Sequence, residues 1–281
     1  MGEPAEIVPN FFIAGAPKSG TTSLYHYLDQ HPQIYMSPIK EPHYFASEVR
    51  MERLSERLRP RAERDGRKLR EYLDGPMRDK RFGGPVTEWR DYLKLFRDAD
   101  GRKAIGEASV CYLWSESAAA NIHRQIPDAR IIGVLRNPVD MAFSMYLQNL
   151  RSDVLTCTFR EAIEMGLAQR GGPIDVLHPF LDLGLYSAQI SRFITQCGRE
   201  QVRIYWYEEY SAEPSRMLAD IFGFLGVDQD FRPGMSKRYL DAGTPDIALD
   251  PEDRAFLLEF YREDIVKLAD LLQRDLSHWL R

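Results

Sequence analysis

The sequence contains few cysteines and no long apolar run, and each shortage excludes a class of protein. Its three cysteines, Cys111, Cys157 and Cys197, are widely spaced and odd in number, so they form neither a disulfide framework nor a paired CxxC metal site. We therefore expect a reducing compartment and no metal. No stretch approaches the roughly 18 apolar residues that cross a bilayer, and no charged-then-apolar signal region begins the chain. We expect a cytoplasmic protein with no membrane span.

The chain also lacks the basic excess of a general nucleic-acid binder. Its formal net charge is −5 over 281 residues, so we expect no nucleic-acid partner. The charge is uneven, because residues 50–81 contain twelve Lys or Arg against seven Asp or Glu. This basic stretch either clamps an anionic ligand or forms a solvated helical lid with internal salt bridges, and the sequence leaves both open.

Short apolar runs alternate with helical patterns along the chain, which is typical of a parallel sheet covered by helices. A hydrophobic content of 44% is ample for a core. The sequence therefore predicts an α/β fold, a three-layer sandwich with a central parallel sheet of about five strands. The predicted strands are Phe11–Ala14, Ile34–Met36, Ala104–Gly106, Arg130–Leu135 and Val202–Tyr207, and the predicted helices lie near 22–30, 117–125, 138–150, 159–168, 185–197, 214–225 and from 251 to the end.

One segment interrupts this alternation. Residues 47–84 are charged and poor in aliphatic side chains, and they end in the breaker sequence Phe-Gly-Gly-Pro at 82–85. We predict a single domain over residues 1–281, with this segment as an insertion or lid and not a second domain.

The stretch GAPKSGTT, residues 15–22, lies between the first predicted strand and a helix. It nearly matches the phosphate-binding loop GxxxxGK[ST], but Thr21 occupies the lysine position and Lys18 lies three residues earlier. A strand, a tight turn and a helix N-terminus direct backbone N–H groups at one point, which favours an anion and a P-loop-type sheet. The alternative is a glycine-rich connection with an exposed lysine.

A second anion site is predicted at the end of the fourth strand, within RIIGVLRNPV. The buried strand delivers Arg136 to the carboxyl end of the sheet, where ligand sites of α/β folds lie. Arg136 is thus placed to bind a phosphate, and Ser144 to add a hydroxyl from the next helix. The alternatives are an arginine–carboxylate pair and a serine bonded to its own helix. Two anion sites at one edge predict a ligand with two separate phosphate groups.

The sequence KEPHYF, residues 40–45, supplies a candidate general base. Pro42 restricts the backbone and favours an extended conformation at Glu41, which would hold the carboxylate in one direction. His43 is the alternative base, because two residues along an extended chain return to the same face. The other interpretation is structural: Glu41 pairs with Lys18 or Lys40, and His43 packs beneath Tyr44.

These stretches together resemble one family. GAPKSGTTSLYHYLDQHP, KEPHYF and RIIGVLRNPVDMAFSMYLQNL are similar to motifs of the sulfotransferases that use 3′-phosphoadenylyl sulfate (PAPS), particularly the heparan-sulfate and other carbohydrate sulfotransferases. The first motif resembles that family's loop for the 5′-phosphosulfate, and the last its site for the 3′-phosphate. Weaker similarity at 184–187, 202–205 and 222–226 extends the resemblance over most of the chain.

The resemblance implies an enzyme. It would transfer a sulfuryl group from PAPS to a hydroxyl, or less readily an amine, of a small-molecule, glycan or lipid acceptor, releasing adenosine 3′,5′-bisphosphate without a metal. Lys18 would stabilise the leaving phosphate, and Glu41 would match the family's base. The residues implied to bind the cofactor are Lys18, Ser19, Gly20, Thr21, Thr22, Arg136, Ser144 and, from a weaker match, Arg238.

Two departures from the family pattern bear on the acceptor. Carbohydrate members often have Glu-Lys-Thr where this chain has Glu107-Ala108-Ser109, and their late disulfide is absent here. Together with the lack of a membrane anchor, these departures favour a soluble bacterial enzyme with a small-molecule or lipid-linked acceptor over a Golgi enzyme. The aromatic residues that either line an acceptor cleft or belong to the core are Tyr44, Trp89, Tyr92, Tyr112 and Trp114.

Two other functions compete with sulfuryl transfer. A P-loop kinase or NTPase predicts a lysine at position 21 and an acidic Mg²⁺ ligand at a strand end, where the chain has Thr21 and Arg136. A non-catalytic nucleotide-binding relative predicts binding without turnover. The sequence leaves the acceptor open, and the oligomeric state as well, a homo-oligomer included.

Overall fold

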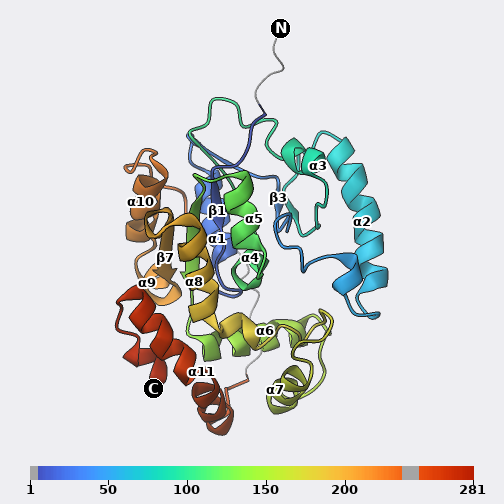
Figure 1. Ribbon diagram of the computed structural model, residues 1–281, viewed down its shortest axis with the longest axis vertical. Helices are drawn as coiled ribbons and strands as arrows, with labels where there is room; N and C mark the ends of the chain where they lie inside the picture. Colours follow the sequence, from blue (N-terminus) through green and yellow to red (C-terminus); the bar gives the residue numbers. More distant parts are fainter. Residues whose placement is uncertain (1–5, 236–246) are drawn as a thin grey trace.

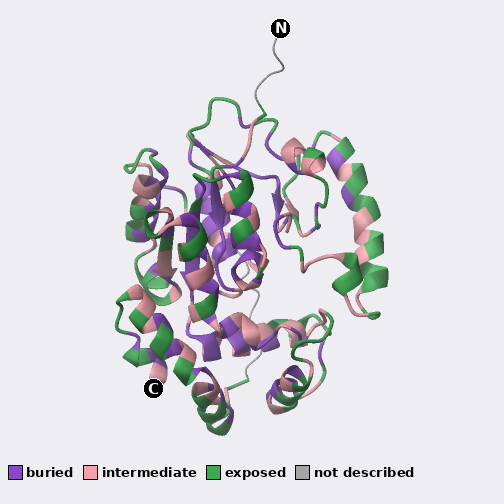
Figure 2. Ribbon diagram, viewed as in Figure 1, coloured by how far each residue is buried: buried purple, intermediate pink, exposed green. Residues whose placement is uncertain are grey.

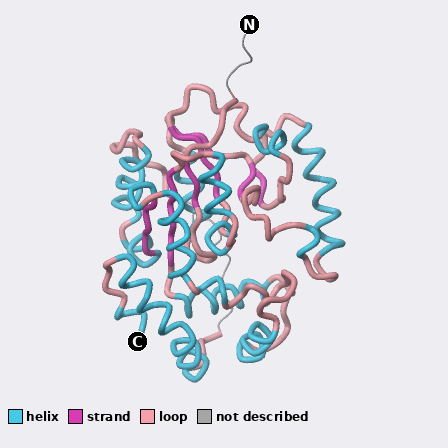
Figure 3. The backbone as a smooth tube through the Cα atoms, in the orientation of Figure 1, coloured by secondary structure: helices cyan, strands magenta, loops and turns pink. Residues whose placement is uncertain are grey.

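The computed structural model describes residues 6–235 and 247–281, and within them one parallel sheet of five strands forms the centre of the fold (Figure 3). The strand order is β2 (Ile34–Met36), β5 (Ala104–Ala108), β1 (Phe11–Ile13), β6 (Arg130–Leu135) and β7 (Val202–Trp206). The central strand pairs Phe11 with Gly106 of β5 and with Arg130 of β6. All pairs are parallel, so the carboxyl ends of the strands meet at one edge.

Helices cover both faces of this sheet (Figure 1). The helices of the described residues are α1 (Thr21–Asp29), α2 (Arg59–Asp74), α3 (Trp89–Lys94), α4 (Cys111–Trp114), α5 (Ala118–Gln125), α6 (Pro138–Arg151), α7 (Phe159–Ala168), α8 (Tyr186–Cys197), α9 (Tyr207–Ala212), α10 (Pro214–Leu225) and α11 (Pro251–Leu272). Short 3₁₀ turns occur at Met51–Arg53, Asp182–Gly184, Arg199–Gln201 and Ser277–Leu280.

The alternation of side chains along β1 explains the three layers. Phe11 and Ile13 are fully buried in an apolar cluster with α1 and α10, whereas Phe12 is fully buried in a second cluster with α5, α8 and α11. Successive strand residues point to opposite faces, so both faces of the sheet carry a core. Figure 2 shows the sheet as the most buried part of the molecule.

The predicted α/β fold is confirmed. All five predicted strands occur within one or two residues of their expected bounds, and so do the starts of the predicted helices. The last helix does not continue to the end of the chain, as the sequence suggested, but stops at Leu272. Gln273 adopts a left-handed φ of 52°, and the chain turns back so that Trp279 packs against Trp206 at 5.3 Å between ring centroids.

The predicted insertion, residues 47–84, contains α2 and strand β4 (Arg81–Phe82), which pairs in parallel with β3 (Ile39–Lys40). The helix lies at the margin of the molecule and exposes most of its surface (Figure 2), with only Leu69 and Leu73 buried. A parallel bridge joins Leu54 to Ile174, so the segment contacts the loop between α7 and α8. None of the helices in the described ranges is long and apolar enough to span a membrane.

Candidate functional site

Loops after three neighbouring strands meet at the carboxyl edge of the sheet. Residues 15–20 follow β1, Arg136 follows β6, and Ser109 follows β5. Because β1 lies between β5 and β6 and all three strands are parallel, these loops are adjacent. The two anion sites predicted from the sequence therefore lie side by side.

The turn after β1 requires glycine at both ends. A Cβ at Gly15 would lie 2.9 Å from the backbone nitrogen of Val134, and Gly20 adopts a left-handed φ of 77°. Gly20 directly precedes α1, whose N-terminus has no side-chain cap among the described residues. The first N–H groups of a helix have no partner within it, so this end is suited to bind an anion.

The hydroxyl side chains of this loop are buried. Thr21 and Thr22 form the start of α1 and are 5% and 8% exposed. Ser19 is fully buried, and its hydroxyl donates to the carbonyl of Pro17 at 3.3 Å. Ser19 thus stabilises the turn, and the two threonines form the first residues of α1.

Lys18 lies at the centre of a cluster of cations. Its ammonium donates to Gln148 Oε1 of α6 at 2.7 Å. Burial lowers the pKa of Lys18, and the positive charges of Arg136 and Arg151 lower it further. None of these three cations forms an ion pair with a carboxylate in the described ranges. Such a cluster is costly unless an anion binds to it.

Arg136 is fixed by two contacts. Its Nη1 donates to the carbonyl of Lys18 at 3.0 Å, and its guanidinium lies 4.8 Å from the centroid of the Tyr207 ring. Tyr207 is the first residue of α9 and directly follows β7. The sequence analysis identifies Arg136 but misses Tyr207. The position of Tyr207 directly after a strand could have identified it.

One face of α6 points toward the loop. Gln148 follows Ser144 by four residues and precedes Arg151 by three, so all three share a face of the helix. Gln148 contacts Lys18 directly. Helical spacing from Ser144 would have found Gln148, which the motif comparison missed.

Glu41 has a different backbone from the extended one expected next to Pro42. Its φ is 68° and that of His43 is 57°, both left-handed. The reason lies in β5: the Glu41 N–H donates to the Ala108 carbonyl at 2.8 Å, and its Oε2 accepts from the Val110 N–H at 2.8 Å. Both ends of the residue turn toward the same strand end, which an extended backbone does not allow.

The two alternative candidate bases, Glu41 and His43, lie close together. His43 Nδ1 lies 3.8 Å from Glu41 Oε2 and 2.9 Å from the Cys111 sulfur. Burial lowers the pKa of His43, which favours the neutral imidazole. Lys40 is 3% exposed and forms an ion pair with Glu41 Oε1, so the structural pairing considered for Glu41 is present as well.

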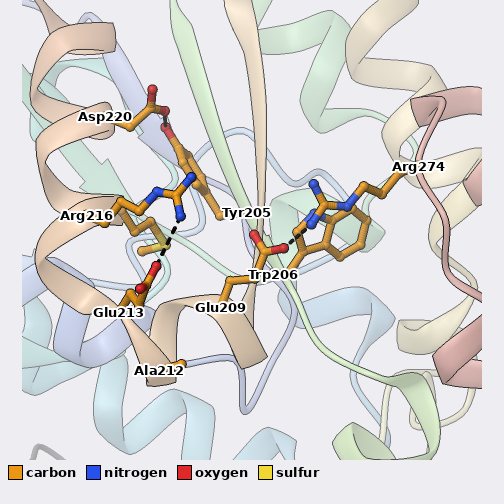
Figure 4. A pocket seen from close by; sticks show the side chains of 9 residues that line it. Tyr205, Trp206, Glu209, Ala212, Glu213, Arg216, Asp220 and Arg274 are labelled. Carbon is orange, nitrogen blue, oxygen red and sulfur yellow. Dashed lines mark hydrogen bonds and ion pairs between the residues drawn. The ribbon is translucent and has the colours of Figure 1, made fainter.

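Two hollows open on the surface away from this loop. The first, about 490 Å³, lies on the outer side of β7 and α9 (Figure 4). Its charged groups neutralise one another, as in the Arg216–Glu213 and Arg274–Glu209 pairs. The second, about 550 Å³, is bounded by the end of α4, by α8 and by the loop before it, with Trp114 and Arg192 in its wall.

Two further predictions concern Arg238 and the absence of a metal. Arg238 falls in 236–246, outside the described residues. Within those residues no three His, Cys, Asp or Glu side chains form a group that could hold a metal ion.

Comparison with known proteins adds the family. A model of the sulfotransferase family matches residues 9–231, which include the Lys18 loop, Glu41 and Arg136. The chain belongs to the sulfotransferase family. Its similarity to the crystal structure of a sulfotransferase from Alicyclobacillus acidocaldarius has a TM-score of 0.80 at 33% identity, over 98% of this chain and 100% of that one.

This chain is also similar in sequence to part of the length of curated animal sulfotransferases. Carbohydrate sulfotransferase 15 of Mus musculus is 26% identical over 97% of this chain and 54% of its own length. The bifunctional heparan sulfate N-deacetylase/N-sulfotransferase 4 of Mus musculus is 26% identical over 98% of this chain and 31% of its own length. The chain thus spans about half, or less, of these relatives. The predicted family is confirmed, and the kinase alternative is not favoured.

Proposed function

We propose that this chain transfers a sulfuryl group from PAPS to a hydroxyl of an acceptor and releases adenosine 3′,5′-bisphosphate. The observation that carries the proposal is the cluster of Lys18, Arg136 and Arg151 without a carboxylate partner in the described ranges, next to the uncapped N-terminus of α1. A ligand with phosphate groups at two points satisfies both features.

In this proposal the loop of residues 15–20 binds PAPS, the sulfuryl donor. The acceptor oxygen bonds to sulfur as the bond from sulfur to the bridging phosphate oxygen breaks. Lys18 donates a hydrogen bond to that bridging oxygen, and the N–H groups at the start of α1 hold the 5′ end. Arg136, with Ser144 on α6, holds the 3′-phosphate. Gln148 keeps the Lys18 ammonium in place until the donor binds.

Glu41 takes the acceptor proton in this proposal. Lys40 forms an ion pair with Oε1 and the Val110 N–H donates to Oε2, while each oxygen retains a further lone pair for a proton. His43 is the second candidate. Replacement of Glu41 by Gln should lower kcat at least about 100-fold, the usual scale for a general base. If His43→Gln produced that loss and Glu41→Gln did not, the roles would be exchanged.

The hollow beside α4 is our candidate for part of the acceptor site. Cys111 at the start of α4 contacts His43, and Trp114 at its end lies in the wall of the hollow, one helical turn away. The names of the relatives mention carbohydrate and heparan sulfate as their substrates. A small-molecule, glycan or lipid acceptor therefore stays a proposal, to be tested by the effect of Trp114→Ala on the acceptor KM.

A thermal-shift experiment separates the donor from its rival. Adenosine 3′,5′-bisphosphate without magnesium should raise Tm by several degrees in the wild type and much less in Arg136→Gln. Stabilisation by Mg-ATP alone would instead support a kinase. The cytoplasmic location and the absence of a metal stay predictions from the sequence, and the oligomeric state stays open.

A further inference from the structure

Glu107 is a fully buried carboxylate at the end of β5 that the proposed chemistry does not use. Three hydroxyls surround it. Tyr92 and Tyr112 donate to Oε1 at 3.1 Å and 2.5 Å, and Ser109 donates to Oε2 at 2.9 Å. Tyr92 and Tyr112, considered for an acceptor cleft, are themselves fully buried here. This carboxylate therefore interacts with the protein alone.

The direction of these hydrogen bonds determines whether the surrounding hydroxyls donate to or accept from neighbouring backbone groups. A hydroxyl carries one hydrogen, so once it donates to Glu107 its oxygen can only accept from other groups. The Ser109 oxygen accepts from the His43 N–H at 3.2 Å, and the Tyr112 oxygen accepts from the Phe45 N–H at 3.4 Å. Glu107 thus sets two hydroxyls as acceptors for the backbone that carries the candidate bases.

That backbone needs support. Left-handed φ values at the non-glycine residues Glu41 and His43 are strained and persist only when surrounding contacts hold them. The contacts come from the end of β5, through the Ala108 carbonyl, the Ser109 hydroxyl and the Val110 N–H. Ala108 contributes only its carbonyl, because its side chain is fully buried in the cluster beneath the sheet.

We propose that Glu107 is a positioning residue for sulfuryl transfer. Its carboxylate orients the hydroxyls of Ser109 and Tyr112, and these hold residues 41–45 so that Glu41 and His43 keep one orientation toward the acceptor. The stretch Glu107-Ala108-Ser109 thus acts through a carboxylate, a carbonyl and a hydroxyl. This inference rests on the proposed function, since it assigns a role in the same reaction.

Glu107→Gln tests the proposal directly. A glutamine accepts at one atom and donates at the other, so at least one surrounding hydroxyl must reverse and lose its role as acceptor. At pH 8 we expect kcat to fall at least tenfold, while the KM for PAPS and the thermal shift with adenosine 3′,5′-bisphosphate change less than twofold. A purely structural residue would lower Tm and leave kcat of the folded enzyme unchanged.

Ser109→Ala provides the second variant. It keeps Glu107 but removes the acceptor of the His43 N–H, so kcat should fall severalfold by itself. The double variant should lose no more than Glu107→Gln alone, because both changes break the same chain of hydrogen bonds. If Glu107→Gln fails to fold, a wild-type kcat in Ser109→Ala overturns the proposal.

Asp264→Asn is the matched control. Asp264 of α11 also accepts from a serine hydroxyl, that of Ser187, but far along the chain from residues 41–45. The kcat of Asp264→Asn should equal that of the wild type. Equal kcat in Glu107→Gln and the wild type refutes the positioning role and leaves the proposed function intact. A wild type that transfers no sulfuryl group to any acceptor refutes the proposed function, and this inference with it.

Discussion

Lys18 is the residue on which the proposed chemistry depends most. Its ammonium lies among other cations and, within the described ranges, donates its one side-chain hydrogen bond to Gln148 Oε1. We predict that Lys18→Met lowers kcat at least about 100-fold, because charge developing on the leaving group loses its donor. Steady-state kinetics with PAPS provide the measurement, and Gln148→Ala, which keeps the ammonium, should cost less than tenfold. Activity of Lys18→Met within tenfold of the wild type would contradict the assignment.

Glu107 makes a separate prediction about stability and pH. Burial raises the pKa of its carboxyl from 4.5 to about 7, aided by the charge of Glu41 and opposed by hydrogen bonds from Tyr112, Ser109 and Tyr92. Between these two values the folded protein keeps a proton that the unfolded chain releases. The free energy of unfolding should therefore fall as pH rises from about 4.5 to about 7, by up to about 3 kcal/mol from this group.

The comparison with Glu107→Gln isolates this effect. Urea unfolding at pH 5 and pH 8 measures the free energy of unfolding for both proteins, and other titrating groups cancel in the difference. The wild type should lose more stability than the variant between the two pH values. An identical pH dependence in both would mean that Glu107 titrates in the folded state as it does in the unfolded chain.

Single residues were predictable where a motif fixes them and not where tertiary contacts do. Lys18 and Arg136 follow from a loop pattern and a strand end. The left-handed backbone of Glu41 was not predictable, because it depends on the end of β5, which lies more than sixty residues along the chain. Tyr207 likewise gains its role only when β7 pairs with β6.

At the scale of elements, the turn before α1 sets the geometry of the site. A Cβ at Gly20 would lie 2.7 Å from Cε1 of Tyr210 in α9, and φ there is 77°. We predict that Gly20→Ala lowers the free energy of unfolding by at least about 1–2 kcal/mol and weakens binding of adenosine 3′,5′-bisphosphate.

Gly101→Ala separates the cost of the left-handed backbone from the cost of the clash with Tyr210. Gly101 has φ of 73° with no heavy atom within 4 Å of its added Cβ, so it carries the backbone cost without the clash. Denaturant unfolding and calorimetric titration of both variants give the comparison. Equal losses of stability, with nucleotide binding unchanged in Gly20→Ala, would show that the contact with Tyr210 does not shape the loop.

The strands of the main sheet and most helices were predictable, whereas three elements of two to four residues were not. Strands β1 and β6 of the main sheet are buried apolar runs, and the helices near 138–151 and 214–225 carry clear starts at proline. By contrast, β3 and β4 have two residues each and α4 has four, so their pattern is too short to detect. Strands β3 and β4 exist because the fold pairs them; Glu41 directly follows β3, and Cys111 begins α4.

At the scale of the whole molecule, the C-terminal segment packs against residues next to the proposed phosphate site. Trp279 is 1% exposed and packs on Trp206 and Tyr186, and its carbonyl accepts from Asn137 Nδ2 at 3.4 Å. Asn137 caps α6 directly after Arg136. Residues 232–281 lie outside the family match, yet this part of the chain contacts a residue next to the proposed phosphate site.

Trp279→Ala should therefore affect both stability and binding. Removal of a fully buried indole costs about 3–5 kcal/mol, and we expect weaker binding of adenosine 3′,5′-bisphosphate as well. Urea unfolding and a thermal shift measure the two effects, with Trp279→Phe as a smaller change at the same place. Unchanged stability in Trp279→Ala would mean that this segment is not part of the core.

Sulfuryl transfer itself is the central claim, and a mass measurement tests it most directly. The protein is incubated with PAPS and a panel of phenols, sugars, steroids and lipids, in parallel with Lys18→Met and Glu41→Gln. We predict an acceptor that gains the mass of one sulfuryl group, with equimolar adenosine 3′,5′-bisphosphate, in the wild type and at least 100-fold more slowly in either variant. Equal transfer by the wild type and both variants, or consumption of PAPS without any sulfated acceptor, would contradict this account.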